Sequence, residues 1–60
     1  MNALEKQIRA FAVKAQDISH GIFASAISLA DGLADGSITT DEATKQLAEL
    51  KSDLDEAAAE

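Results

Sequence analysis

The sequence has no cysteine, proline, tryptophan or tyrosine and only two phenylalanines. The lack of cysteine excludes disulfide bonds and thiolate metal sites, which often stabilise chains this small. The lack of proline and the scarcity of aromatic and β-branched residues favour helices over a sheet. The longest stretch without a formal charge, 18–30, has 13 residues and is too short for a membrane-spanning helix. These absences predict a helical, soluble, cytoplasmic protein.

The composition is rich in small apolar and acidic residues. Thirteen of the 28 apolar residues are alanine, so only 15 large apolar side chains are available to build a core. A monomer with so few is expected to be marginally stable, which favours a homodimer or higher homo-oligomer, or a protein partner. Eleven acidic residues against five basic ones give a net charge of −6. We therefore expect a partner with a basic surface, and neither nucleic acid nor membrane binding.

Apolar residues recur at alternating steps of four and three along the first half of the chain. This heptad spacing predicts one continuous helix over about 3–34, because it keeps the residues on one face. The pattern passes through Gly21 without losing phase, and a break near His20 is the alternative. The seam is the predicted interface and comprises Leu4, Ile8, Phe11, Ala15, Ile18, Ile22 and Leu29.

The signals for a turn and a second helix follow. Gly36 suits the left-handed conformation that ends a helix, and Thr39 and Glu42 have the spacing of a capping box. The sequence therefore predicts a turn over 35–39 and a helix over about 40–58. Two helices joined by a short link form an antiparallel hairpin, here a single all-α domain over 1–60.

The two predicted helices differ in length, about 48 Å against about 28 Å at 1.5 Å per residue. Residues 1–16 are therefore expected to form an overhanging amphipathic arm. Its apolar side chains need a cover, which predicts self-association as a coiled coil or four-helix bundle. The simplest form is an antiparallel dimer.

The segment 26–42 resembles the calcium-binding loop of the EF-hand family. The resemblance implies five calcium ligands, at the first, fifth, seventh, ninth and twelfth loop positions: Asp31, Asp35, Ser37, Thr39 and Glu42. The third position is Leu33, which has no ligating oxygen and continues the apolar stripe. We therefore expect a capped helical turn here and no metal site.

The segment 35–47 also resembles the turn of the short C-terminal (SHOCT) domain family. That resemblance implies a small helical hairpin used for interaction, with no catalytic residues to carry over. We also expect no cofactor. Asp17, Ser19 and His20 are adjacent in sequence, but on one helix they point in different directions. We expect no enzymatic activity.

These observations predict a non-enzymatic protein–protein interaction or assembly module that acts through self-association and an acidic helical surface. One alternative is a small inhibitor or antitoxin-like regulator, of the kind encoded by phages or plasmids, that blocks a larger protein. A second alternative is a degenerate EF-hand-like hairpin that responds to calcium.

Overall fold

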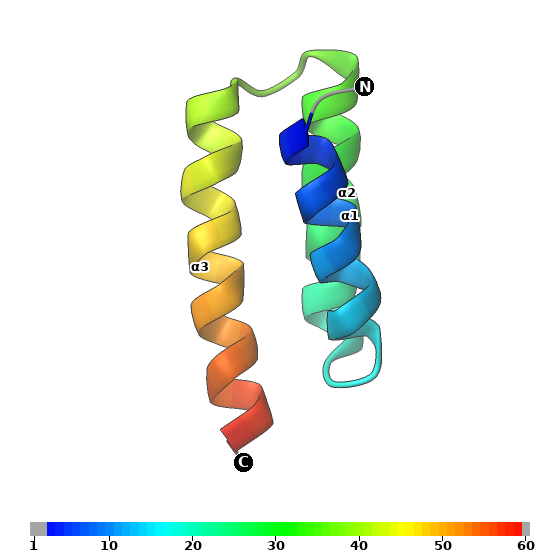
Figure 1. The fold of residues 1–60 in the computed structure, drawn as a ribbon, viewed down its shortest axis with the longest axis vertical. Coiled ribbons are helices and arrows are strands. Elements are labelled where there is room, and N and C mark those ends of the chain that lie inside the picture. The colour runs from blue at the N-terminus through cyan, green and yellow to red at the C-terminus, as the bar shows by residue number, and fades with distance from the viewer. Residues whose placement is uncertain (1–2, 60) are drawn as a thin grey trace.

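A computed structural model describes residues 3–59, which form three α-helices and no strand. Helix α1 spans Ala3–Gln16, α2 spans His20–Asp35 and α3 spans Thr40–Ala59. Consecutive helices run antiparallel in a bundle of 35 × 17 × 16 Å (Figure 1). The predicted all-helical class is confirmed. Residues 1, 2 and 60 of the predicted single domain lie outside the described range.

The prediction of one continuous helix over 3–34 is wrong, because the chain turns back at 17–19. The carbonyl of Ala15 accepts the N–H groups of Ile18 and Ser19 at 3.0 and 2.8 Å, which closes α1. Ser19 is extended, with φ −149° and ψ 112°, and its Oγ accepts the N–H of Ile22 at 3.4 Å. Ser19 is thus the N-cap of α2. The alternative break near His20 is where α2 begins.

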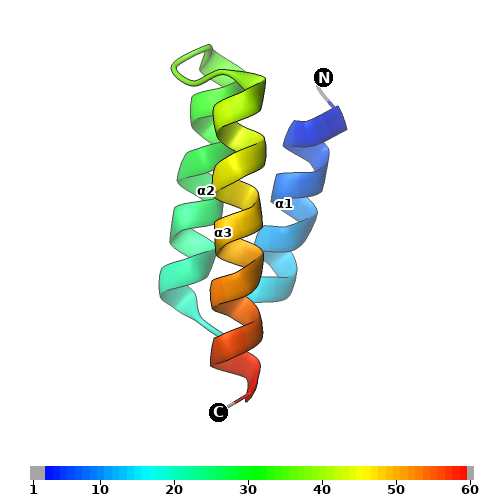
Figure 2. The ribbon, with the colours of Figure 1, turned by 90° about the vertical axis from the view of Figure 1, so that its left-hand side faces the viewer.

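Residues 3–16 do not overhang, because α1 folds back along α2 and buries its own apolar face. Ile8 is fully buried and Phe11 nearly so. Removing a side chain of this size from water stabilises a fold by about 1.5–3 kcal/mol. In a single chain, a continuous helix would leave both side chains in water. The segment that projects is the C-terminal end of α3, which extends past the α1–α2 turn (Figures 1 and 2).

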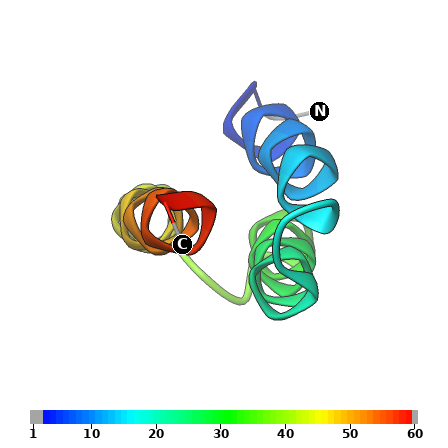
Figure 3. The same ribbon diagram turned by 90° about the horizontal axis from the view of Figure 1, so that it is seen from below.

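The three helices lie at the corners of a triangle, and α2 packs against both neighbours, whereas α1 and α3 touch each other less (Figure 3). All three helices contribute to one core: Ile8, Phe11, Ala12, Ala15, Ala26, Leu29, Ala30, Ala43, Leu47 and Leu54. Half of these residues are alanines, which lets the helices approach closely. None of the helices within 3–59 combines the length and the apolar character needed to cross a membrane.

The link between α2 and α3 agrees with its prediction. Gly36 is left-handed, with φ 83° and ψ 9°, and its N–H bonds to the carbonyl of Gly32. Thr39 caps α3, since its Oγ1 accepts the N–H of Glu42 at 3.1 Å. Ile38 folds over Gly32, where a Cβ atom would lie 3.6 Å from the isoleucine side chain. The predicted roles of Gly36 and Thr39 are confirmed, and α3 begins and ends within one residue of its predicted bounds.

Candidate functional site

The seven predicted interface residues lie mostly inside the chain's own bundle. Four of them, Ile8, Phe11, Ala15 and Leu29, are buried in the core, and Leu4 and Ile22 pack at its edge. Ile18 differs, because it sits in the α1–α2 turn with 42% of its surface exposed. The seam therefore joins α1 to α2 within one chain.

A cluster of three charged side chains ties α1 to α2. Arg9 Nε donates to Glu5 Oε2 at 3.0 Å, and Arg9 Nη2 donates to Asp31 Oδ1 at 3.1 Å. Glu5 is the buried member, since only 12% of its side chain is exposed, against 63% for Asp31. The hydrogen bonds to Glu5 and then Asp31 raise the pKa of the Arg9 guanidinium above its ordinary value. Sequence reasoning missed this ion pair, because its partners are 22 residues apart.

The five residues of the EF-hand resemblance do not form a calcium loop. Asp31 and Asp35 are both within α2, so they follow helical geometry instead of wrapping around an ion. Asp31 pairs with Arg9, Thr39 caps α3, and Glu42 Oε1 accepts Gln46 Nε2 at 3.1 Å. Within 3–59, no three His, Cys, Asp or Glu residues gather as metal ligands would.

Asp35 and Ser37 instead close the C-terminal end of α2. Asp35 Oδ1 accepts both the Ser37 backbone N–H, at 2.8 Å, and the Ser37 hydroxyl. These bonds, with the hydroxyl as the larger cause, lower the pKa of the Asp35 carboxyl from its ordinary value. The pair is an Asx-type turn that shapes the link to α3.

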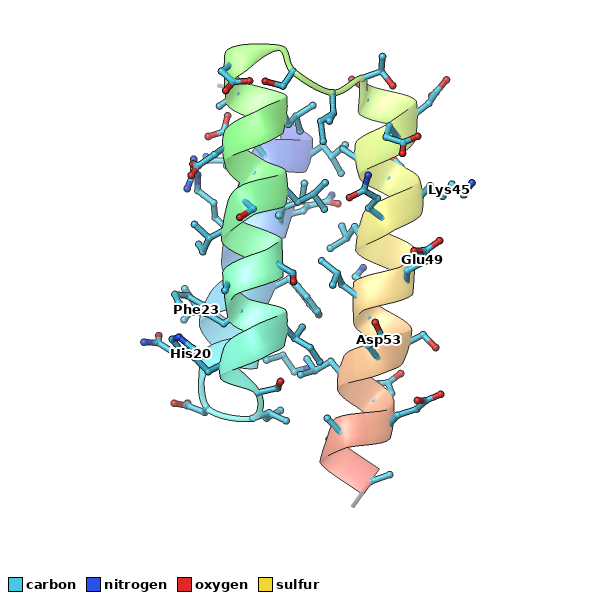
Figure 4. All side chains as sticks on the ribbon, turned by 180° about the vertical axis from the view of Figure 1, so that it is seen from behind. His20, Phe23, Lys45, Glu49 and Asp53 are labelled. Atoms are coloured by element: carbon cyan, nitrogen blue, oxygen red, sulfur yellow. The ribbon has the colours of Figure 1, made fainter. Side chains whose placement is uncertain are left out.

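Asp17, Ser19 and His20 lie around the α1–α2 turn and are not arranged as a catalytic group. The Ser19 hydroxyl is engaged as the N-cap, and the exposed His20 ring lies beside Phe23, with ring centroids 5.7 Å apart and tilted by 42° (Figure 4). The sequence signal for the cap was present, since serine stands three residues before Ile22. The prediction followed the heptad phase and did not identify this cap.

A shallow groove of about 430 Å³ runs between α2 and α3. Small residues of α2 form one wall, and Ile38 and Gln46 close the other side; the lining is Ala24, Ser25, Ser28, Leu29, Ile38 and Gln46. The run of small residues in α2 thus serves two surfaces. Ala26 and Ala30 are buried in the core, whereas Ala24, Ser25 and Ser28 face solvent in the groove.

The most strongly charged surface lies on α3. This helix carries six acidic and two basic residues, a net charge of −4. Its acidic side chains are all exposed: Asp41, Glu42, Glu49, Asp53, Asp55 and Glu56. Glu49 points away from the bundle (Figure 4), and Asp53 is exposed on the same helix. Both salt bridges found within 3–59 involve Arg9, so none of these carboxylates forms a salt bridge there, although Lys45 lies four residues from Glu49 on the same helix. We call this surface the acidic face.

Three features are therefore candidates for function: the α1–α2 contact inside the bundle, and on its surface the α2–α3 groove and the acidic face of α3. Comparison of the chain with protein-family models, with curated proteins and with solved structures gave no match.

Proposed function

We propose that this protein is a non-enzymatic protein–protein interaction module that presents the acidic face of α3 to a basic surface on a larger protein. The observation that carries the proposal is the division of α3 into two sides. Ala43, Leu47 and Leu54 are buried against the bundle, while the carboxylates on the other side are exposed and form no salt bridge within 3–59.

A surface of this kind suits recognition of a basic partner for two reasons. Clustered charge of one sign steers an oppositely charged partner and raises the rate of association. The acidic face also costs the folded chain some self-repulsion that a basic partner would relieve. Because such interactions are screened over about 8 Å at physiological salt, binding should weaken as salt is added.

The test is a pair of charge reversals at matched positions. Glu49→Lys changes the acidic face, and Asp17→Lys makes the same change in net charge at the α1–α2 turn. Both side chains are exposed, and neither takes part in a salt bridge of the described residues. Each variant, like the unmodified chain, is immobilised and exposed to a lysate, and retained proteins are identified and then purified for titration.

A partner that binds the unmodified chain and Asp17→Lys equally, but Glu49→Lys at least several-fold more weakly, supports the proposal. Equal binding by all three proteins contradicts it, as does binding that is insensitive to salt. If the purified partner is an enzyme, its activity with and without the chain tests the inhibitor alternative. Loss of activity on addition of the unmodified chain, spared by Glu49→Lys, would identify a regulator acting through the acidic face.

A further inference from the structure

The apolar faces of α1 and α2 can cover each other in two ways, within one chain or between two copies of it. We propose that it is also an interface between two copies of this chain, in which residues 17–19 become helical and α1 of each copy packs on α2 of the other. In the exchanged dimer, α1 and α2 form one straight helix, and two such helices lie antiparallel around a two-fold axis. This inference is independent of the acidic face, which neither α1 nor α2 forms.

The first support is the phase of the apolar pattern across the turn. Ala12, Ala15, Ser19, Ile22 and Ala26 follow one another at steps of three, four, three and four. On a straight helix they would share one face. Ala12, Ala15 and Ala26 are fully buried, and they belong to the core that joins α1 to α2. Straightening the turn therefore keeps the apolar surfaces of α1 and α2 on the same side, where a second copy can cover both.

The second support is that bonds of helical spacing flank the turn on both sides. The N–H of Ser19 already bonds to the carbonyl of Ala15 at 2.8 Å, and the N–H of Phe23 bonds to the carbonyl of Ser19 at 3.0 Å. Both bonds have the four-residue spacing of an α-helix. No residue other than glycine has a positive φ within 3–59. Between these two bonds, Ser19 is extended and its Oγ takes the N–H of Ile22, so straightening the turn replaces this cap with the helical bonds that it displaces.

The third support is Ile18, whose side chain is 42% exposed in the turn. On a straight helix it occupies the seam between Ala15 and Ile22, close to the two-fold axis of the dimer. There it would be covered by the same seam of the second copy. Exchange would also retain the Arg9–Asp31 pair, now formed between chains, because every α1–α2 contact is reproduced. A second copy of the chain therefore fits this surface, because it carries the same α1 and α2.

A distance measurement separates the two arrangements. Ala3 and Ala34 are exposed, and the chain has no cysteine, so Ala3→Cys with Ala34→Cys gives two specific labelling sites. In the folded-back chain, the start of α1 lies beside the end of α2 (Figure 1). In the straight helix, the two labels of one chain are about 47 Å apart. Labelled chains are diluted into excess unlabelled chain, so that only the distance within one chain is read.

Turn variants then shift the equilibrium in known directions. Ser19→Ala removes the cap that stabilises the turn and favours helix, so it should raise the dimer association constant about tenfold, since each dimer opens two turns. Thr39→Ala removes the equivalent cap of α3 and should leave that constant unchanged. Two glycines inserted after Asp17 should lower it about tenfold, because flexible residues favour the turn over the helix.

Mass measurement across a concentration series, together with the label distance, decides the matter. We expect a dimer fraction that grows with concentration and with Ser19→Ala, and that contains the long distance. A Ser19→Ala protein that remains monomeric at millimolar concentration would overturn the proposal. A dimer that retains only the short distance would also overturn it, because the copies would then meet through another surface. The insertion variant keeps the test decisive if Ser19→Ala fails to fold, since an unchanged dimer fraction there contradicts exchange.

Discussion

Arg9 on α1 reaches Asp31 on α2, with 3.1 Å between Nη2 and Oδ1, although 22 residues separate them in sequence. The same guanidinium holds Glu5 through Nε at 3.0 Å. One arginine therefore links a carboxylate that is almost buried to one that is mostly in solvent. The two bonds should contribute differently to stability, because a carboxylate removed from water depends more on its partner.

This difference predicts unequal effects on stability at pH 7. Asp31→Asn removes only the exposed pair, and such pairs contribute little. Arg9→Met removes both bonds and leaves the buried Glu5 without Arg9, so it should lower the melting temperature more. Thermal unfolding followed by circular dichroism measures both, with Lys6→Met as a control that removes an exposed positive charge from the same helix. Equal losses for Arg9→Met and Asp31→Asn would contradict this assignment.

A second prediction compares two β-branched residues of α1 at opposite extremes of burial. Ile8 is fully buried, whereas 66% of Val13 is exposed. Ile8→Ala should cost about 2–5 kcal/mol in free energy of unfolding, because it opens a cavity in the core. Val13→Ala should change that free energy by no more than about 0.5 kcal/mol. Urea unfolding measures both, and similar losses would mean that α1 does not pack on α2 through this face.

The two ends of α2 show what could and could not be predicted from the sequence. Its C-terminal end depends on local chemistry: Gly36 can be left-handed and Thr39 can cap, whatever the rest of the chain does. Both were correctly predicted, and so was α3. The break at Ser19 could not be predicted in the same way, because a heptad phase reports which residues share a face and says nothing about where the chain folds back on itself.

Whether the chain turns back at Ser19 or continues as a helix depends on how Ile8 and Phe11 are buried. A single chain can cover Ile8 and Phe11 only by turning back, whereas two chains can cover them without turning. The sequence pattern fits both solutions, which explains why the continuous helix was predicted. The Arg9–Asp31 pair has no local signature at all, because it exists only once α1 lies on α2.

A third prediction concerns acid. The pKa of Asp35 is below its ordinary value of 3.8 in the folded chain, owing to the hydrogen bonds from Ser37. A lowered pKa means that the ionised carboxylate favours the fold. This contribution is fully present above the unfolded value and is lost as the pH falls through the folded one. The relevant window therefore lies below about pH 4.

Titration of the Asp35 side chain by NMR should give a midpoint below the ordinary value. Ser37→Ala should raise that midpoint, because it removes the hydroxyl bond and leaves the backbone bond. The stability difference between Ser37→Ala and the unmodified chain should be constant near neutral pH and shrink in acid. A midpoint for Asp35 that does not respond to Ser37→Ala would contradict the hydrogen bond as its cause.

The fourth prediction separates a helix cap from a calcium site in the α2–α3 link. Thr39→Ala should cost about 0.5–2 kcal/mol in free energy of unfolding, which is the usual effect of losing an N-cap. The loss should be the same with and without calcium, since Thr39 Oγ1 serves the backbone N–H of Glu42. Urea unfolding in millimolar calcium and in chelator measures this directly.

Glu42→Gln provides the matched test, because it keeps the shape of the side chain and removes the charge that a calcium ion would need. If Asp31, Asp35 and Glu42 held an ion, calcium would raise the melting temperature, and Glu42→Gln would abolish the rise. The Arg9–Asp31 pair and the helical placement of both aspartates favour the opposite outcome. We expect no melting shift with either protein and no heat of binding by calorimetric titration. A saturable heat with one site per chain, lost in Glu42→Gln, would show that the link rearranges around calcium.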